Sequence, residues 1–536
     1  MNKTSFLVLL FISILPAHLF SQQNKLIGKT AFNSQYPQFF HFRGEMKRDV
    51  HTDYDTWEKK YVTSSGLLRK YICEELKIDT ILYSWLNRFA ETYPEKLLLL
   101  HFNGEARQVN DYPEINKKYF PGHWVYETGS LLSEDCTSSQ THIIHHWFNP
   151  DNGILKKLDG IAFDVNYFDV SKHESWDTNN DGQADGGWIN GQNIWQAGDL
   201  QFLKNLRKRM GQNFIITCDG QHPINQQAVG VLNGIESEGL VQHNDGWRGF
   251  SRTVNTHLYW DKFNPLSPQF RYVVLKLMDG NDQHHAERLR RFGVATASCL
   301  GAYTTVPDSY SFLPSWIQPC SFGRIQGELI RYAKSSPNLL SGTPAELLHK
   351  GILKGENCCM SIQGNSIIIK PATQSSTLSI KNVELPTGDI TIFIEAETIT
   401  PPDANSDLVP RFIYASLSNL PDYEPEKKTK EFFTDLYGLV GHEKNENSFY
   451  FRRPKVSAGK QTLTITIKGT EQLQIHSIKI YNRPDIIIRQ FENAVVCVNP
   501  SLEEQEIHLS DFITEYSEKL KIAPIDAVFI PKSKNK

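Results

Sequence analysis

The chain has 536 residues, enough for two or three domains, and a net charge of −4 with no basic stripe. This charge pattern argues against nucleic acid as a partner, and no apolar run after the N-terminus is long enough to cross a bilayer. Eight cysteines occur without a Cys-x-x-Cys pair, so we do not expect a disulfide framework.

The N-terminus predicts export. Met1-Asn2-Lys3 precedes an apolar run from Phe6 to Phe20, and Ser21 supplies a small residue at the cleavage position. The run is shorter than the roughly 20 residues of a membrane-spanning helix. We therefore expect a signal peptide at 1–21 and a periplasmic or secreted chain with no membrane span after cleavage. The sequence does not indicate an oligomeric state.

Between about residues 35 and 340, short apolar runs alternate with helical patterns. The helical patterns include 199–210 and 283–292. The runs that predict strands are 38–42, 80–84, 97–102, 123–127, 160–164, 213–218, 231–236, 272–277 and 294–300. Alternation of strand and helix indicates a parallel sheet, and this number of strands favours a closed barrel over a doubly wound sheet. The predicted fold class is therefore α/β, with a (β/α)8 TIM barrel at 30–342.

The pattern changes after about residue 345. Short β-branched runs with turn signals follow one another at 366–370, 377–380, 389–395, 461–468 and 473–481. They predict an all-β sandwich at 343–483, which either binds carbohydrate or supports the barrel. We expect residues 484–536 to be a small β module packed on the barrel or the sandwich. They form either a separate module or a sheet with the strand near Ser366, with the sandwich inserted between.

Two segments in the barrel region share one design. Asp159-Gly160-Ile161-Ala162-Phe163-Asp164 and Asn233-Gly234-Ile235-Glu236-Ser237-Glu238 each predict a strand that begins at a glycine and ends on a carboxylate. Asp219 ends a third strand. Barrel enzymes carry their chemistry at such carboxyl ends. Cleavage of a glycosidic bond needs one protonated carboxylic acid and one ionised carboxylate, so the three strand ends predict this chemistry.

These segments resemble the glycoside-hydrolase-like TIM barrels, which include the endo-α-1,4-polygalactosaminidase type. The segments 38–43 and 489–500 are similar to the opening and closing parts of such barrels. The resemblance implies that an aspartate on strand four and a glutamate on strand six are catalytic, here Asp164 and Glu238. The chain departs from the family at Asn233, where aspartate is frequent. The extra acid Glu236 leaves the choice between Glu236 and Glu238 open.

We predict Glu238 as the general acid and Asp164 as the nucleophile or base, with the reverse assignment also open. Neighbouring polar groups would orient sugar hydroxyls or hold the two acids at different pKa values. Seven tryptophans lie between Trp124 and Trp260, and flat aromatic faces suit sugar rings. The substrate-binding candidates are Arg43, Asn103, Trp124, Tyr167, Asp219, Glu236 and Trp247.

A loop after Asp164 has the start of a calcium-binding pattern. Oxygen-bearing side chains alternate along it, with Gly182 at the sixth position. The candidate ligands are Asp177, Asn179, Asp181, Gln183 and Asp185. The twelfth position is Trp188 instead of glutamate, which excludes a full EF-hand. A structural calcium loop and a solvated turn both remain open, and the predicted chemistry requires no cofactor.

The sequence therefore predicts an exported glycoside hydrolase acting on a poly- or oligosaccharide. An alternative is a non-catalytic glycan-binding surface protein that uses the barrel as a scaffold. A third is an acid/base polysaccharide lyase with calcium, for which the loop at 177–185 is the only indication.

Overall fold

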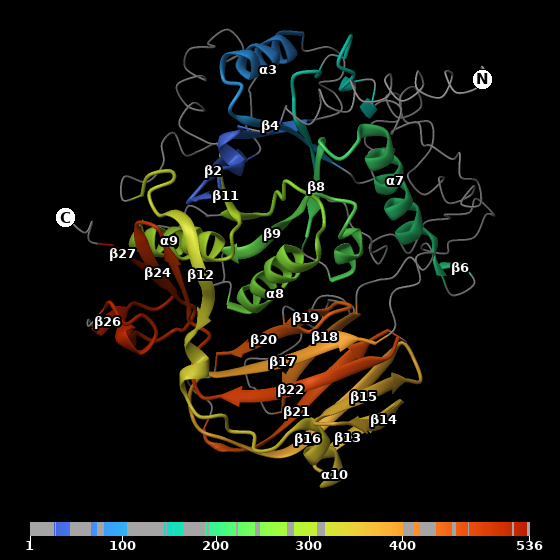
Figure 1. Cartoon of the computed structure of the whole chain (residues 1–536), viewed down its shortest axis with the longest axis vertical. Helices are drawn as coiled ribbons and strands as arrows, with labels where there is room; N and C mark the ends of the chain where they lie inside the picture. The colour runs from blue at the N-terminus through green and yellow to red at the C-terminus, as the bar shows by residue number, and fades with distance from the viewer. Residues whose placement is uncertain are drawn as a thin grey trace, which may run out of the picture.

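The computed structural model describes residues 26, 28–42, 66–71, 80–103, 144–145, 147–153, 155–164, 188–189, 192–220, 223–241, 247–275, 283–307, 317–399, 411–418, 436–452, 457–469, 471–516 and 519–532. Three bodies are visible in Figure 1: a barrel, a sandwich below it and a smaller sheet at one side. The predicted signal peptide lies outside the described residues. Within them, no helix is both long and apolar enough to cross a membrane.

Eight parallel strands close into a barrel. In spatial order they are β2 (Phe39–Phe42), β3 (Gly66–Tyr71), β4 (Leu97–Asn103), β5 (Gly160–Asp164), β8 (Ile215–Asp219), β9 (Gly234–Val241), β10 (Tyr272–Leu275) and β11 (Tyr303–Pro307), which pairs with β2. The described connections hold α3 (Thr80–Thr92), the hairpin β6 (Trp188–Ile189) and β7 (Gln192–Asn193), α7 (Ile194–Met210), the 3₁₀ turn η6 (Pro223–Ala228), α8 (Trp247–Phe263) and α9 (Gln283–Cys299).

The predicted fold class, a (β/α)8 TIM barrel followed by a sandwich region, is wrong for this chain. Of the described residues, 45% lie in strands and 23% in helices, with five α-helices among them, and antiparallel sheets dominate. Even the described connection from β8 to β9 is a 3₁₀ turn instead of an α-helix. Within the described residues, strand and helix therefore do not alternate regularly.

Two of the predicted strands are helices. The runs at 80–84 and 294–300 lie in α3 and α9, because a short apolar run has the same appearance in a buried helix and in a strand. Conversely, the sequence pattern missed β3 and β11, since β3 carries two basic residues and β11 two threonines. The predicted strand at 123–127 lies outside the described residues.

Two five-stranded antiparallel sheets form the sandwich. One contains, in order, β13 (Leu353–Glu356), β16 (Ser375–Leu385), β21 (Gly459–Lys468), β18 (Arg411–Leu417) and β19 (Tyr437–Val440). The other contains β14 (Cys358–Gln363), β15 (Ser366–Pro371), β22 (Leu473–Tyr481), β17 (Ile390–Thr398) and β20 (Asn445–Phe451). Alternate residues such as Leu463, Ile465 and Ile467 face the shared core, as expected for half-buried strands. The short helix α10 (Pro344–His349) packs at one end.

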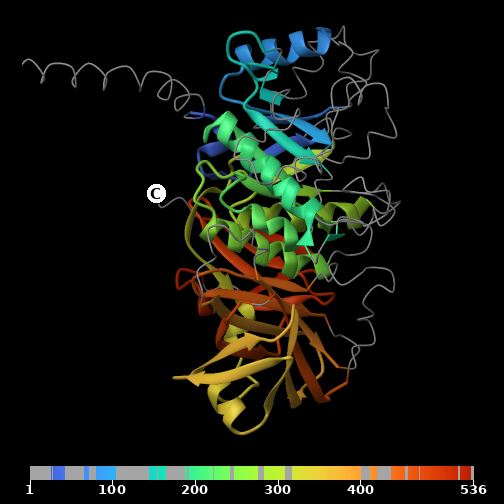
Figure 2. The same ribbon diagram turned by 90° about the vertical axis from the view of Figure 1, so that its right-hand side faces the viewer.

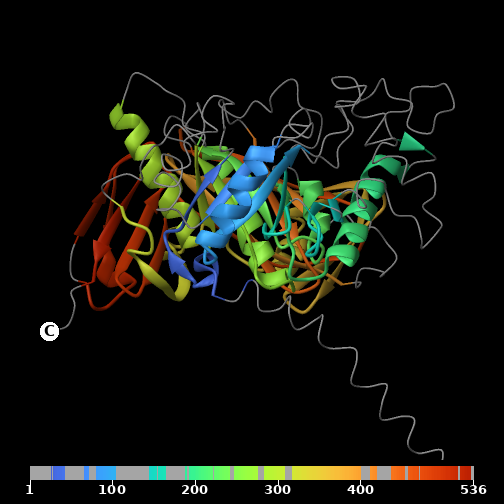
Figure 3. The same cartoon turned by 90° about the horizontal axis from the view of Figure 1, so that it is seen from above.

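A third sheet joins the two ends of the chain. Its order is β1 (Gln35–Tyr36), β12 (Gly323–Arg331), β23 (Ile487–Phe491), β24 (Ala494–Asn499) and β27 (Asp526–Pro531), with the hairpin β25 (Gln505–His508) and β26 (Lys519–Ile522) beside it. The C-terminal segment thus pairs with β12 and not with β15, so the sandwich is inserted between β12 and β23. In Figure 3 this sheet lies against α9, where Arg291 forms two hydrogen bonds of 2.8 and 2.7 Å with Asp526.

Helix α8 lies between the barrel and the sandwich, as the two perpendicular views in Figures 1 and 2 show. Phe412, Tyr414 and Tyr437 of the sandwich belong to the same buried cluster as Trp260 of α8. Burial of aromatic surface on this scale stabilises a contact strongly. The sandwich is therefore packed on the barrel through α8.

Candidate functional site

Three adjacent barrel strands bring polar side chains together at their carboxyl ends. Asp219 of β8 is the register partner of Glu236 of β9, and Glu236 is the partner of Tyr272 of β10. Asp219 is 1% exposed and Glu236 is fully buried. Register partners in a parallel sheet place their side chains on the same face, about 5 Å apart. Two carboxyl groups therefore share a dry environment.

Tyr272 contacts one of these acids directly. Its hydroxyl donates a hydrogen bond of 2.7 Å to Oε2 of Glu236. A hydrogen bond to a buried carboxylate is worth more than one at the surface, because water does not compete for it. This contact fixes the position of the Glu236 carboxylate inside the barrel.

Glu238 lies two residues farther along β9, where the strand becomes irregular. Val273 of β10 pairs with Ser237 and Leu275 pairs with Val241, so two steps on β10 match four steps on β9. Bulges of this kind are frequent beside active sites because they redirect side chains. Glu238 is 6% exposed, and its backbone oxygen accepts a 2.8 Å hydrogen bond from Nη2 of Arg252. Beyond Glu238, the side chains of β9 therefore do not simply alternate between the two faces of the sheet.

Asp164 ends β5, where it pairs with Asn103 of β4. For both residues, the backbone is described and the side chain is not. Strand β5 is next to β8, and β8 is next to β9. Two strand spacings amount to about 10 Å between the backbones of β5 and β9. Asp164 and Glu238 thus belong to two strands separated by β8, which carries Asp219.

The glycines that begin the two similar segments are required by close approach of neighbouring strands. A Cβ added at Gly160 would lie 2.0 Å from the carbonyl oxygen of Ile215. At Gly234 it would lie 1.8 Å from the carbonyl oxygen of Phe270. Only glycine permits such an approach. The shared glycine is therefore a feature of barrel closure and not of chemistry.

The residues before these glycines are also structural. Oδ2 of Asp159 accepts a 2.9 Å hydrogen bond from the backbone N–H of Leu98 and forms a 2.8 Å ion pair with Nζ of Lys29. At the equivalent place in the second segment, Oδ1 of Asn233 accepts a 2.9 Å bond from the backbone N–H of Ile216.

The hydrogen-bond partners explain why the first segment has an aspartate, Asp159, where the second has an asparagine, Asn233. Nδ2 of Asn233 donates a 3.0 Å hydrogen bond to the carbonyl oxygen of Pro268, which an aspartate cannot do. Arg207 of α7 donates to the other end of the same amide. The departure of Asn233 from the family pattern thus has a local explanation and does not touch the acids.

The other side of β9 is held by a buried histidine of α8. Nε2 of His257 lies 3.0 Å from the hydroxyl of Ser237, the residue between Glu236 and Glu238. Burial, and secondly the charge of Arg271, hold the pKa of His257 well below its ordinary value of 6.5. The imidazole is therefore neutral and fixes β9 from outside the barrel.

The remaining predicted site residues either lie outside the described part of the chain or have a side chain that is not described. Arg43, Trp124 and Tyr167 lie outside the described residues, as does the loop with Asp177, Asn179, Asp181, Gln183 and Asp185. Trp247 begins α8, but its side chain is not described. Where side chains are described, no group of three or more His, Cys, Asp or Glu residues could hold a metal ion.

Sequence reasoning missed two buried residues of this region. Tyr272 begins β10, and its role depends on a partner 36 positions away. His101 is fully buried in β4 and pairs with Ala162 of β5. A histidine directly after four leucines is an unusual interruption of an apolar strand, and that pattern was the available signal.

A scan of family models gives no match to the chain, and no curated protein matches it. Among solved structures, a family 61 carbohydrate-binding module in complex with β-1,4-galactotriose is similar, with 15% identity and a TM-score of 0.20, over 28% of this chain and 100% of that one. A C-terminal family 6 module of a marine laminarinase from Zobellia galactanivorans has 12% identity and a TM-score of 0.18, over 29% and 99%. A family 29 carbohydrate-binding module from Piromyces equi has 13% identity and a TM-score of 0.17, over 24% and 80%.

Proposed function

We propose that this protein binds a poly- or oligosaccharide and hydrolyses its glycosidic bonds with two carboxyl groups of the barrel. The observation that carries the proposal is the set of acids at the carboxyl ends of adjacent parallel strands, Asp219, Glu236 and Glu238. Hydrolysis of a glycosidic bond uses two carboxyl groups in one site, one as a protonated acid and one as an ionised carboxylate.

We assign the general acid to Glu238 instead of Glu236. Glu236 is fully buried and accepts the hydroxyl of Tyr272, so it is held within the barrel wall. Glu238 lies farther toward the carboxyl end, in the irregular part of β9. Asp164, two strands away, is the partner acid in this proposal, and Asp219 and Glu236 orient the pair. Carboxyl groups about 5–5.5 Å apart are typical of retaining enzymes, and separations of about 6.5–9.5 Å are typical of inverting enzymes.

The test is a screen of the purified chain against a panel of polysaccharides, with released reducing ends as the readout. Glu238→Gln and Asp164→Asn should each lower release by about 10²-fold or more, because a proton donor or an anion is removed. Glu384→Gln is the matched control, since Glu384 is exposed on the sandwich far from these strands and should leave release unchanged. Circular dichroism checks that all three variants are folded.

The outcome separates two functions. Release that disappears in Glu238→Gln and persists in Glu384→Gln supports the hydrolase. Binding of a polysaccharide without release, equal in all variants, would contradict it and support a non-catalytic glycan-binding protein.

A further inference from the structure

Helix α8 contacts the barrel strand that carries Glu238. Arg252 donates to the backbone oxygen of Glu238, and His257 lies within hydrogen-bonding distance of the Ser237 hydroxyl. Both contacts fall on the segment of β9 where the pairing with β10 becomes irregular. A strand that has lost part of its ladder depends more on its other neighbours. The position of Glu238 therefore depends on the position of α8.

The same helix contacts the sandwich through Ser251 and Asn255, one helical turn apart. The Ser251 hydroxyl accepts a 2.9 Å hydrogen bond from the backbone N–H of Tyr450. Oδ1 of Asn255 accepts from the N–H of Ser448 at 2.9 Å, and its Nδ2 donates to the carbonyls of Tyr437 and Ser448 at 2.8 and 2.9 Å. One side chain thus satisfies backbone groups of two sandwich strands, β19 and β20.

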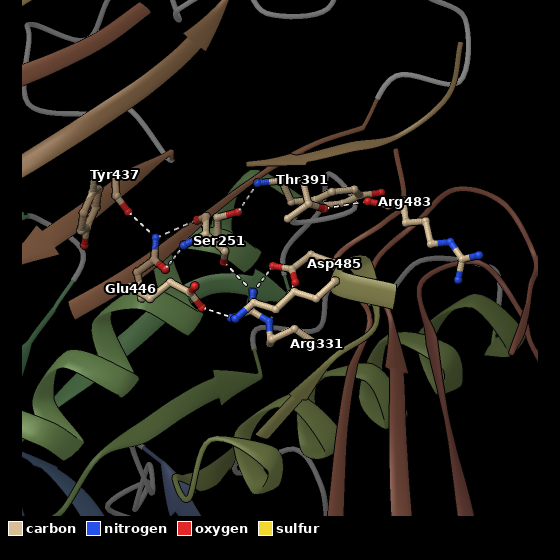
Figure 4. A network of polar contacts seen from close by, with 11 residues as sticks. Ser251, Arg331, Thr391, Tyr437, Glu446, Arg483 and Asp485 are labelled. Carbon is tan, nitrogen blue, oxygen red and sulfur yellow. Dashed lines mark hydrogen bonds and ion pairs between the residues drawn. The ribbon is translucent and has the colours of Figure 1, made fainter. Parts of the chain in front are cut away.

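A buried ion pair holds the same sandwich strand from a second direction, as Figure 4 shows. Nη2 of Arg331, at the end of β12, donates a 2.6 Å hydrogen bond to the Ser448 hydroxyl. The same guanidinium pairs with the fully buried Asp485, which precedes β23. Strand β20 is therefore fixed to the barrel helix and to the third sheet at one residue, Ser448.

From these contacts we infer that Ser251 and Asn255 are positioning residues for the proposed reaction, and that the sandwich acts as a fixed support for α8 and, through it, for Glu238. The role of Glu238 in this inference rests on the proposed function. The mechanical coupling of the sandwich to β9 through α8 does not. The aromatic residues Phe412, Tyr414 and Tyr437 of the sandwich are buried at this contact. Their rings therefore support the barrel and are not free to stack on sugars.

Hydrogen exchange measured by mass spectrometry tests the coupling without a substrate. Asn255→Ala should speed amide exchange about tenfold in peptides covering β9 and α8, because α8 loses hydrogen bonds to the sandwich and β9 depends on α8 for its position. The matched control is Asn447→Ala. Asn447 is an equally buried asparagine of β20 whose amide bonds Leu439 of the sandwich, at 2.9 and 2.8 Å. That variant should speed exchange in β19 and β20 and leave β9 unchanged.

The milder variant Ser251→Ala covers the case in which Asn255→Ala does not fold. It removes one acceptor, and it should give a smaller change with the same pattern. Equal exchange of β9 in Asn255→Ala, Ser251→Ala and the wild type would overturn the inference. So would equal acceleration of β9 in the Asn447→Ala control.

Activity adds a second readout once the wild type releases reducing ends from a polysaccharide. Asn255→Ala should lower kcat about tenfold with little change in KM, because a displaced acid affects the transition state and not substrate affinity. Asn447→Ala should keep kcat. If the wild type releases no sugar, the proposed function fails while the exchange result still decides the coupling.

Discussion

At the scale of single residues, Tyr272 is the side chain most directly tied to the acids. Replacement by phenylalanine removes the hydroxyl that bonds Glu236. We expect Tyr272→Phe to lower the free energy of unfolding by about 1–3 kcal/mol, as for other lost partners of buried polar groups. Urea unfolding of Tyr272→Phe, Glu236→Gln and the double variant measures the coupling between the two residues. Additive effects would show that the hydrogen bond contributes nothing.

His257 gives the fold a dependence on pH. Its lowered pKa means that the unfolded chain takes up a proton below pH 6.5 that the folded chain does not. Stability is therefore lost as pH falls from 6.5 toward the lowered folded-state value, by about 1.4 kcal/mol per pH unit. His257→Gln removes this titration. The unfolding free energy of the wild type minus that of the variant should be flat above pH 6.5 and fall below it, and parallel curves would contradict the assignment.

At the scale of elements, the entry to β9 depends on Gly234. An added Cβ would meet the backbone of Phe270, which cannot move without opening the barrel wall. We expect Gly234→Ala to cost about 3 kcal/mol in unfolding free energy. Gly364→Ala is the comparison, since its Cβ meets nothing and only its positive φ of 60° adds strain, about 1 kcal/mol. Equal costs would mean that the strands adjust.

The sequence predicts a strand or helix where its local pattern is strong. It does not predict features that depend on the register between neighbouring strands. The predicted strand at 160–164 and the helix ending at Met210 are confirmed, because both have a strong local pattern. The bulge after Ser237 depends on how β9 meets β10, and nothing in its own residues encodes that offset. The contact of Tyr272 with Glu236 has the same origin. The three acids were predictable by type, and their grouping became visible only in the paired strands.

At the scale of the whole molecule, the buried ion pair of Arg331 and Asp485 connects the third sheet to the sandwich, because Arg331 also donates to Ser448 of β20. Arg331→Met leaves the Asp485 charge buried without its partner, which costs about 3–5 kcal/mol. We expect calorimetry to show one unfolding transition for the wild type and an earlier, divided transition for Arg331→Met. Arg331→Met with Asp485→Asn should recover part of the loss, because the uncompensated charge is gone. Two separate transitions in the wild type would show that the bodies unfold independently.

The sheet that joins β1 to β27 also has a consequence for the order in which the chain is assembled. Residues 35–36 and 526–531 lie in one sheet, so this sheet is complete only after residue 531 has been synthesised. The sandwich strands lie together at 353–481 and can pair earlier. Contacts between distant segments form late, because the long intervening chain must first be brought together. Until β27 is made, the edge of β24 that pairs with it stays uncovered in a nascent chain.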